Sequence, residues 1–224
     1  NGAIAVMAIA EKGGLLHAPD MYMEKLCVGP RGAGAIDITK SLTENIKNVA
    51  AKMNRNVDEI TLVMLDRERH HGLMKEARDL GARIMLISDG DVNPAMECCI
   101  EGSGVHMVVG TGGAPEGVLA AAALKCVGGD MQARLKPETE EEIRRCHEMG
   151  ITDVNQVLTL DDLVRTDDVI FAATAITRGN LLNAIQYFPG GARTHTIVMR
   201  SKTGTVRFLD TVHMDDKLKS LKAK

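Results

Sequence analysis

A regular alternation of short apolar runs and amphipathic segments constrains the fold of this chain more than any other feature. Three apolar runs, at 60–65, 83–87 and 105–109, are each followed by a segment whose apolar residues have helical spacing. Strands that alternate with helices form right-handed βαβ units, whose parallel strands are covered by helices on both faces. The pattern therefore predicts an α/β fold. A fourth apolar run, 168–173, is expected to join the same parallel sheet.

Both ends of the chain carry the pattern of antiparallel strands. Apolar runs flank a Lys12-Gly13-Gly14 turn near the start and a Lys202-Thr203-Gly204 turn near the end, and each predicts a hairpin. Chain ends are often neighbours in space, so we expect both regions to share one sheet of a second domain. The predicted organisation is 1–54 as part of an amino-terminal α+β domain with antiparallel hairpins and a helix, 55–190 as a parallel α/β domain, 191–214 as a hairpin that returns to the first domain, and 215–224 as a polar tail.

Composition excludes several classes of partner. The 224 residues carry a formal net charge of −3 and contain no Trp, three Phe and two Tyr, so the chain lacks the basic field and the stacking side chains that nucleic acid needs. No apolar run approaches the ~20 residues of a membrane span. The five Cys are odd in number and Cys98 and Cys99 are adjacent, which fits neither zinc ligation nor a disulfide framework. We expect reduced thiols in a cytoplasmic protein.

Charged residues and glycines follow the predicted parallel strands, at the edge where open α/β sheets bind ligands. Arg67, Arg69, His70 and His71 form a cationic cluster after the first strand, and arginine forks match phosphate oxygens. The glycine-rich segment 110–117 joins a strand to a helix, where backbone amides and the helix dipole can hold an anion. Both features predict a phosphate site.

Two groups of carboxylates extend this candidate site. Asp89 and Asp91 follow the second strand and can accept hydrogen bonds from sugar hydroxyls, or serve only as a helix cap and turn. Glu116 can hold a hard divalent cation beside the phosphate, or only complement a helix dipole. Together the strand ends point to a phosphorylated polyol, so the predicted 55–190 domain would bind a sugar phosphate.

A rival interpretation rests on the same glycine-rich segment. Gly110-x-Gly112 begins like a dinucleotide-binding motif, which would make the chain a nucleotide-dependent oxidoreductase. Pro115 occupies the position of the third glycine, and no Gly-Lys-Ser/Thr appears, so both nucleotide motifs fail. A titration with dinucleotide separates the two interpretations.

Three blocks of residues resemble, in order along the chain, the class II fructose-1,6-bisphosphatases of bacteria. They are Ala18-Pro19-Asp20-Met21-Tyr22-Met23-Glu24-Lys25, Asp89-Gly90-Asp91 and Gly112-Gly113-Ala114-Pro115-Glu116-Gly117. The resemblance implies a layered α/β/α/β/α fold, similar to the sugar phosphatases of the inositol-phosphatase type, with a parallel α/β second domain. It also implies hydrolysis of the 1-phosphate of fructose 1,6-bisphosphate with Mg²⁺ or Mn²⁺, activity of some members on sedoheptulose 1,7-bisphosphate, and a homo-oligomer.

The resemblance assigns roles to individual residues. Glu116 matches a metal-binding glutamate, and no catalytic residue is matched within the chain. Glu68 stands where a Lys/Arg-Pro-Arg segment of the family has its proline. The residues that match substrate-binding positions are Tyr22, Arg67, Glu68, Arg69, Asp89, Gly90, Asp91 and Gly113.

One family motif is absent from the chain. The family has an Asp-Pro-x-Glu/Asp-Gly-Thr motif, with further metal-binding carboxylates, before the segment that resembles 1–9, and the sequence does not contain it. We therefore expect a carboxyl-terminal fragment with an incomplete first domain, inactive by itself because its metal cage is incomplete. A sugar-phosphate-binding or assembly module without activity is the alternative.

Overall fold

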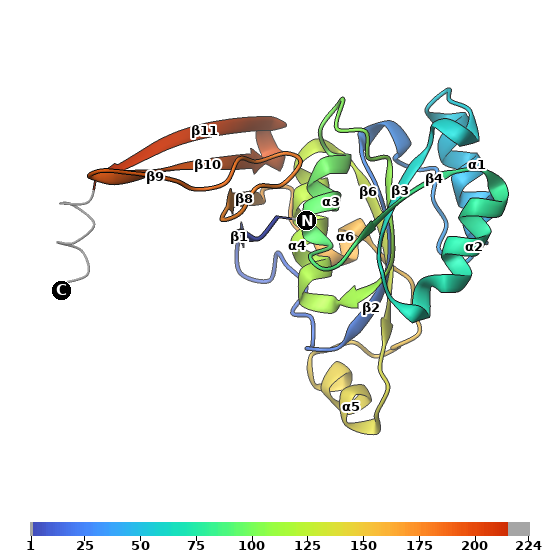
Figure 1. Ribbon diagram of the computed structural model, residues 1–224. Helices are drawn as coiled ribbons and strands as arrows, with labels where there is room; N and C mark the ends of the chain where they lie inside the picture. Colours follow the sequence, from blue (N-terminus) through green and yellow to red (C-terminus); the bar gives the residue numbers. More distant parts are fainter. Residues whose placement is uncertain (1, 215–224) are drawn as a thin grey trace.

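Two β-sheets and the helices around them are formed by residues 2–214, the part of the chain that the computed structural model describes (Figure 1). The predicted tail, 215–224, lies outside the described residues, as does Asn1. No helix within 2–214 is long and apolar enough to cross a bilayer.

The larger sheet has six strands in the order β4-β3-β5-β2-β6-β7. β3 is parallel to β4 and β5, which confirms the predicted alternation, whereas β2 is antiparallel to both of its neighbours. β7 is antiparallel to β6 at the edge. The strands are β2 (Tyr22–Val28), β3 (Thr61–Leu65), β4 (Arg83–Ile87), β5 (Met107–Gly113), β6 (Asp130–Lys136) and β7 (Leu158–Thr159).

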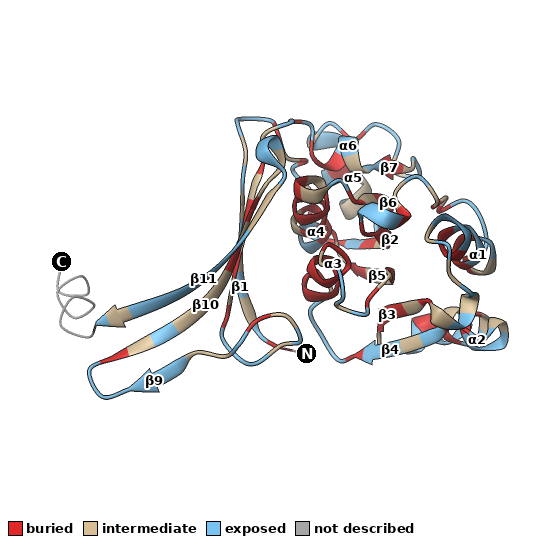
Figure 2. Cartoon of the chain, turned by 90° about the horizontal axis from the view of Figure 1, so that it is seen from above, coloured by how far each residue is buried: buried red, intermediate tan, exposed pale blue. Residues whose placement is uncertain are grey.

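Helices cover both faces of this sheet, as the alternation predicts (Figure 2). α1 (Leu42–Lys52) and α2 (His71–Leu80) lie on one face, and α3 (Val92–Cys98) and α4 (Ala114–Val127) lie on the other. A capping box of Ser41 and Glu44 begins α1. The remaining helices are α5 (Glu140–Glu148), α6 (Leu160–Leu163) and the 3₁₀ turns η1 (Pro30–Gly32), η2 (Val57–Glu59), η3 (Glu68–His70) and η4 (Ser201–Thr203).

The second sheet is antiparallel and contains both ends of the described chain. Its order is β1-β8-β10-β11, with β9 paired to β10. The predicted turn near the carboxyl end is confirmed: β10 and β11 form an antiparallel pair on either side of residues 201–204, with Arg200 opposite Thr205 next to the turn. The strands are β1 (Ile4–Ile9), β8 (Ile170–Ala175), β9 (Gln186–Phe188), β10 (Gly191–Arg200) and β11 (Thr205–Met214).

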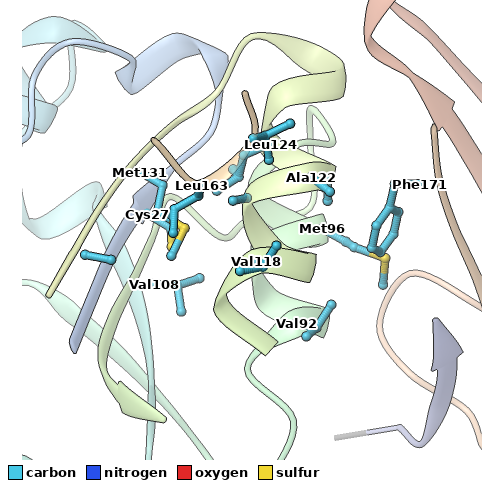
Figure 3. Close-up of a cluster of buried hydrophobic side chains, with 14 of the residues drawn as sticks. Cys27, Val92, Met96, Val108, Val118, Ala122, Leu124, Met131, Leu163 and Phe171 are labelled. Atoms are coloured by element: carbon cyan, nitrogen blue, oxygen red, sulfur yellow. The ribbon is translucent and has the colours of Figure 1, made fainter. Parts of the chain in front are cut away.

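α4 joins the two sheets, because almost its whole circumference is apolar and buried. Its small Ala side chains allow both sheets to approach the helix closely. Figure 3 shows Val118 and Ala122 between Cys27 and Val108 of the large sheet and Phe171 of β8. The layers are therefore α1/α2, six-stranded sheet, α3/α4 and five-stranded sheet, which is the α/β/α/β part of the predicted fold.

Two predictions of strand pairing are wrong. The hairpin expected within 3–28 does not form, because β1 pairs with β8, and β2 pairs with β5 and β6. The run 168–173 does not join the parallel sheet but forms β8 of the antiparallel one. Burial gives the reason: β2 is buried along most of its length and suits a sheet covered on both faces, whereas burial in β8 alternates, as in a sheet with one covered face. Each sheet therefore contains strands from both sides of the predicted boundary at residue 54: β1 pairs with β8, and β2 pairs with β5 and β6.

All five Cys are free and buried. Burial raises the pKa of the Cys126 thiol to about 11 and that of the Cys27 thiol to about 12. These thiols are protonated at neutral pH and serve as core side chains.

Candidate functional site

The predicted site residues gather at one edge of the six-stranded sheet. β3, β4 and β5 end at this edge, and β2 begins there because it is antiparallel to β5. Tyr22 is opposite Gly113 across the β2–β5 pair, and η3 places Arg67–Arg69 directly after β3. We call this group the carboxyl-edge site.

Arg69 is held in place by its neighbours. Its guanidinium carbon lies 4.9 Å from the centroid of the Tyr22 ring, and its Nη2 and Nε donate to the Thr111 carbonyl at 2.8 and 3.3 Å. Tyr22 is 42% exposed. A cation packed on an aromatic face and anchored to a carbonyl loses less entropy when it binds an anion than a free surface arginine does.

His70 is not part of a cationic cluster, which corrects the sequence prediction. The buried ring accepts a hydrogen bond from the Thr111 amide at its Nε2 (2.8 Å), so Nδ1 carries the proton and donates to the Leu65 carbonyl at 2.8 Å. Burial lowers the pKa of His70 against the opposing effect of the hydrogen bond to the Leu65 carbonyl, and Arg69 and Arg67 lower it further. The ring is therefore neutral and fixes the end of β5 beside η3.

Gly110 is required by this contact. Its φ is 137°, and a Cβ at this position would lie 2.8 Å from Cε1 of His70. The glycine that suggested a nucleotide motif therefore makes room for a histidine ring.

Arg67 and Asp89 form a weak pair across the ends of β3 and β4. Nη2 of Arg67 lies 3.4 Å from Oδ1 of Asp89, whose side chain is 91% exposed, and Nη1 donates to the Asp66 carbonyl at 2.9 Å. An exposed pair of this length contributes little to stability. Glu68 is exposed in η3, and His71 is exposed at the start of α2.

Lys25 is a site residue that the sequence prediction missed. It is 4% exposed, and its Nζ donates to Asp91 Oδ2 at 2.5 Å and to the Gly113 carbonyl at 2.7 Å. Asp91 is therefore paired with Lys25 within the protein, and a contact with a ligand would come in addition to this pair. A signal existed: Lys25 alternates with Met23 and Cys27 on one buried face of β2, where a charge needs a partner.

The glycine-rich segment is not the loop that the sequence predicts. β5 continues through Gly113, and the amides of Thr111 and Ala114 donate to His70 and to the Met21 carbonyl. These two amides are thus engaged within the protein. What remains of the predicted anion site is the dipole of α4 and the amide of Glu116, since Pro115 has no N–H group.

Glu116 lies in that first turn and is exposed. Its carboxylate lies against Gly113, where an added Cβ would be 2.0 Å from Oε2. Within residues 2–214, no three His, Cys, Asp or Glu side chains lie close enough together to hold a metal ion. The described residues therefore supply one candidate metal ligand and not a complete site.

The comparison with known proteins agrees with these observations. The family model described as bacterial fructose-1,6-bisphosphatase, glpX-encoded, matches residues 1–213. A protein of Microcystis aeruginosa named D-fructose 1,6-bisphosphatase class 2/sedoheptulose 1,7-bisphosphatase is 45% identical over 98% of this chain and 67% of its own length. The protein of the same name in Synechococcus elongatus is 46% identical over 98% of this chain and 67% of its own length.

The chain thus spans about two thirds of the length of these relatives. The family match over nearly the whole chain, the close identity and the α/β phosphatase fold agree with one another. The chain belongs to the family of glpX-encoded bacterial fructose-1,6-bisphosphatases, which are phosphatases of sugar bisphosphates.

Proposed function

We propose that this chain binds fructose 1,6-bisphosphate for a metal-dependent phosphatase that releases the 1-phosphate and leaves fructose 6-phosphate. The observation that carries the proposal is the position of Arg69, which is anchored over Tyr22 and beside Thr111 at the edge where α4 begins. A guanidinium and a helix N-terminus that share one edge suit a phosphate dianion.

Each predicted residue has a role in this proposal. Arg69 and Arg67 bind the substrate phosphate, with Glu68 between them in η3. Tyr22 and the Gly113 backbone contact the sugar phosphate from the opposite side of the edge. Residues 89–91 accept hydrogen bonds from sugar hydroxyls, and Lys25 holds them in place through Asp91.

Sedoheptulose 1,7-bisphosphate is a second substrate under the same proposal. The relatives in Microcystis aeruginosa and Synechococcus elongatus are named for both bisphosphates. Both sugars carry phosphates and hydroxyls. The carboxyl-edge site offers arginines for the phosphates and carboxylates for the hydroxyls.

Glu116 would bind one Mg²⁺ or Mn²⁺ ion in the proposed enzyme. Such an ion offsets negative charge on a phosphoryl group. A complete site needs further ligands besides Glu116, and residues 2–214 contain no group of three that would hold the ion. The side-chain amide of Asn93, at the start of α3, donates to the Gly2 carbonyl at 2.6 Å. Gly2, the first described residue, therefore lies beside α3, the helix that follows residues 89–91.

Calorimetric titration of the chain with fructose 1,6-bisphosphate tests the binding role. We expect saturable binding that Arg69→Ala weakens roughly ten- to 150-fold, since a charge-assisted contact is lost. Arg78→Ala, on the exposed face of α2, serves as the matched control and should bind as the original chain does. Fructose without phosphate should not bind.

Two outcomes would contradict the proposal. Equal affinity of the Arg69 and Arg78 variants would remove Arg69 from the phosphate contact. Displacement of the bisphosphate by NAD⁺ would favour the oxidoreductase interpretation. Phosphate release by the whole gene product, with Mg²⁺ or Mn²⁺ present, then separates an enzyme from a binding module.

A further inference from the structure

A cavity lies at the edge of the six-stranded sheet opposite the carboxyl-edge site, where β3, β4 and β5 begin and β2 ends. Its volume is about 360 Å³, and its lining includes Arg31, Arg55, Arg83 and His106. We call it the amino-edge pocket. β3 separates it from the carboxyl-edge site by five residues, or roughly 16 Å.

Three arginines reach this pocket from separate segments of the chain. Arg31 comes from η1, Arg83 begins β4, and Arg55 follows α1. Asn54, with φ 53°, ends α1 in a left-handed turn, and the Arg55 amide donates back to the Ala50 carbonyl at 2.9 Å. The turn thus directs Arg55 toward the pocket.

Carboxylates only partly balance these charges. Arg31 pairs with Glu101 at 2.8 Å, but both side chains are at least half exposed. Nη1 of Arg55 is 3.9 Å from Glu59, which is the limit of an ion pair. The pocket lining thus contains three arginines against two glutamates, Glu59 and Glu101, and keeps a formal excess of one positive charge.

Arg55 also contains a polar atom, Nε, that has no partner within the described part of the protein. It is a buried donor, and none of the described residues accepts a hydrogen bond from it. Buried polar atoms in native proteins almost always have partners, and an unsatisfied donor is costly. The Arg55 side chain as a whole is 34% exposed, so a turn of this side chain would bring the unsatisfied donor to an anion in the pocket.

His106 adds a second donor of defined position. Its Nδ1 accepts a hydrogen bond from the Thr61 amide at 3.0 Å, so a neutral ring carries its proton on Nε2. Burial lowers the pKa of His106, with further lowering by Arg55, Arg31 and Arg83 and an opposing effect of Glu59. The ring is neutral and offers an N–H to an anion.

We infer that the amino-edge pocket binds a small phosphate ester at a site separate from the carboxyl-edge site. Three guanidinium groups and an imidazole N–H match phosphate oxygens, and they outnumber the two carboxylates in the lining, those of Glu59 and Glu101. The volume lies within the range of small-molecule sites, and Met53, Ile100 and Val105 provide apolar lining for the organic part of the ester.

The two histidines of the β3–β5 pair allow a test that reports on each edge separately. His106 is in the amino-edge pocket, and His70 is at the carboxyl edge. The chain is labelled with ¹³C-histidine in an Arg69→Gln background, which weakens phosphate binding at the carboxyl edge. Inorganic phosphate is then titrated at constant ionic strength, with sodium chloride as the reference.

We expect phosphate to shift the His106 ring signals and to leave those of His70 unchanged. The pKa of His106 should rise on binding, because a dianion among Arg31, Arg55, Arg83 and Glu59 favours the imidazolium. Arg55→Gln should weaken binding tenfold or more, and Arg78→Gln, outside the pocket, should not.

Three results would overturn the inference. They are a His106 signal that follows ionic strength alone, a phosphate effect confined to His70, and equal affinity of the Arg55 and Arg78 variants. If Arg55→Gln does not fold, Arg83→Gln replaces it, since Arg83 lines the pocket from the exposed start of β4. A titration with a sugar phosphate in place of phosphate then measures the contribution of the organic part.

Discussion

Two histidine rings bridge β3 and β5, one at each end of the strand pair. Direct pairing between these strands is short, with Leu62 opposite Met107 and Val63 opposite Val108. Beyond it, His106 accepts from the Thr61 amide and His70 accepts from the Thr111 amide. Each bridge needs a neutral ring nitrogen as acceptor, and burial lowers the pKa of both histidines, which keeps the rings neutral to a lower pH.

Stability should therefore fall as the pH is lowered from about 7.5 to about 5.5. A histidine with a lowered folded-state pKa is protonated first in the unfolded chain, whose histidines titrate near 6.5. Its contribution is complete above that value and is lost as the pH falls toward the folded-state pKa. Carboxylates with lowered pKa, such as Asp168 beside Arg200, titrate below this window.

Urea unfolding at both pH values measures this effect. His70→Gln should reduce the pH dependence, because a side-chain amide oxygen can accept from Thr111 without titrating. His71→Gln, at the exposed neighbouring position, should retain the full dependence. An equal pH dependence in both variants would show that His70 does not carry the effect.

Glu116 allows a second prediction at the scale of one residue. In the whole gene product, Glu116→Gln should lower phosphate release from fructose 1,6-bisphosphate by at least ~10²-fold, because a charge that holds the metal is lost. Glu140→Gln is the matched control, since Glu140 is an exposed glutamate in the first turn of α5. Near-normal phosphate release by the Glu116→Gln variant would mean that Glu116 does not hold the metal and only complements the dipole of α4.

At the scale of elements, Lys25 joins β2, α3 and the end of β5. It is one of the few buried charges, and the Asp91 side chain is 13% exposed. Removing one partner of a buried pair leaves an uncompensated charge, whereas removing both can be nearly neutral.

Lys25→Met should therefore destabilise the chain by about 3–5 kcal/mol in urea unfolding, and Lys25→Met/Asp91→Leu should recover most of the loss. Lys75→Met is the control: Lys75 pairs with Asp79 on the exposed face of α2, and its loss should change stability by about 0.5 kcal/mol or less. If Lys25→Met/Asp91→Leu is as unstable as Lys25→Met, the unpaired charge of Asp91 is not the cause of the loss, and the prediction is wrong.

At the scale of the whole molecule, the hairpin of β10 and β11 extends away from the helices (Figure 1). One face of β11 carries three exposed apolar side chains, Phe208 (47% exposed), Val212 (51%) and Met214 (55%). Exposed apolar groups of this kind mark contact surfaces. We propose that the chain forms a homo-oligomer through this hairpin.

Light scattering after size-exclusion chromatography tests this assembly. The chain should elute as more than one copy, and Val212→Asp should shift it toward the monomer because a charge is placed on the contact surface. Thr211→Asp introduces the same charge at the adjacent exposed position, on the other face of the strand, and should act less. A single copy at every concentration would contradict the prediction.

Local patterns in the sequence were sufficient for much of the fold and for the place of the site. β3, β4, α2 and α4 lie close to their predicted positions, because apolar periodicity and caps are properties of neighbouring residues. Arg67, Asp89 and Glu116 gather at one edge because the carboxyl ends of parallel strands meet there. Whether these residues have the predicted roles stays a prediction.

Only the tertiary structure decided which partner each segment and each buried polar group would have. Lys25 and Asp91 are 66 residues apart, and His70 and Thr111 are 41 apart. The amino-edge pocket likewise combines Arg31, Arg55 and Arg83 from three separate segments. An apolar run specifies that a strand will be buried but not against which strand, and a buried charge or imidazole needs a partner that no local pattern identifies. The different sheets that β2 and β8 join, the neutral His70 and the Lys25–Asp91 pair therefore follow from long-range packing alone.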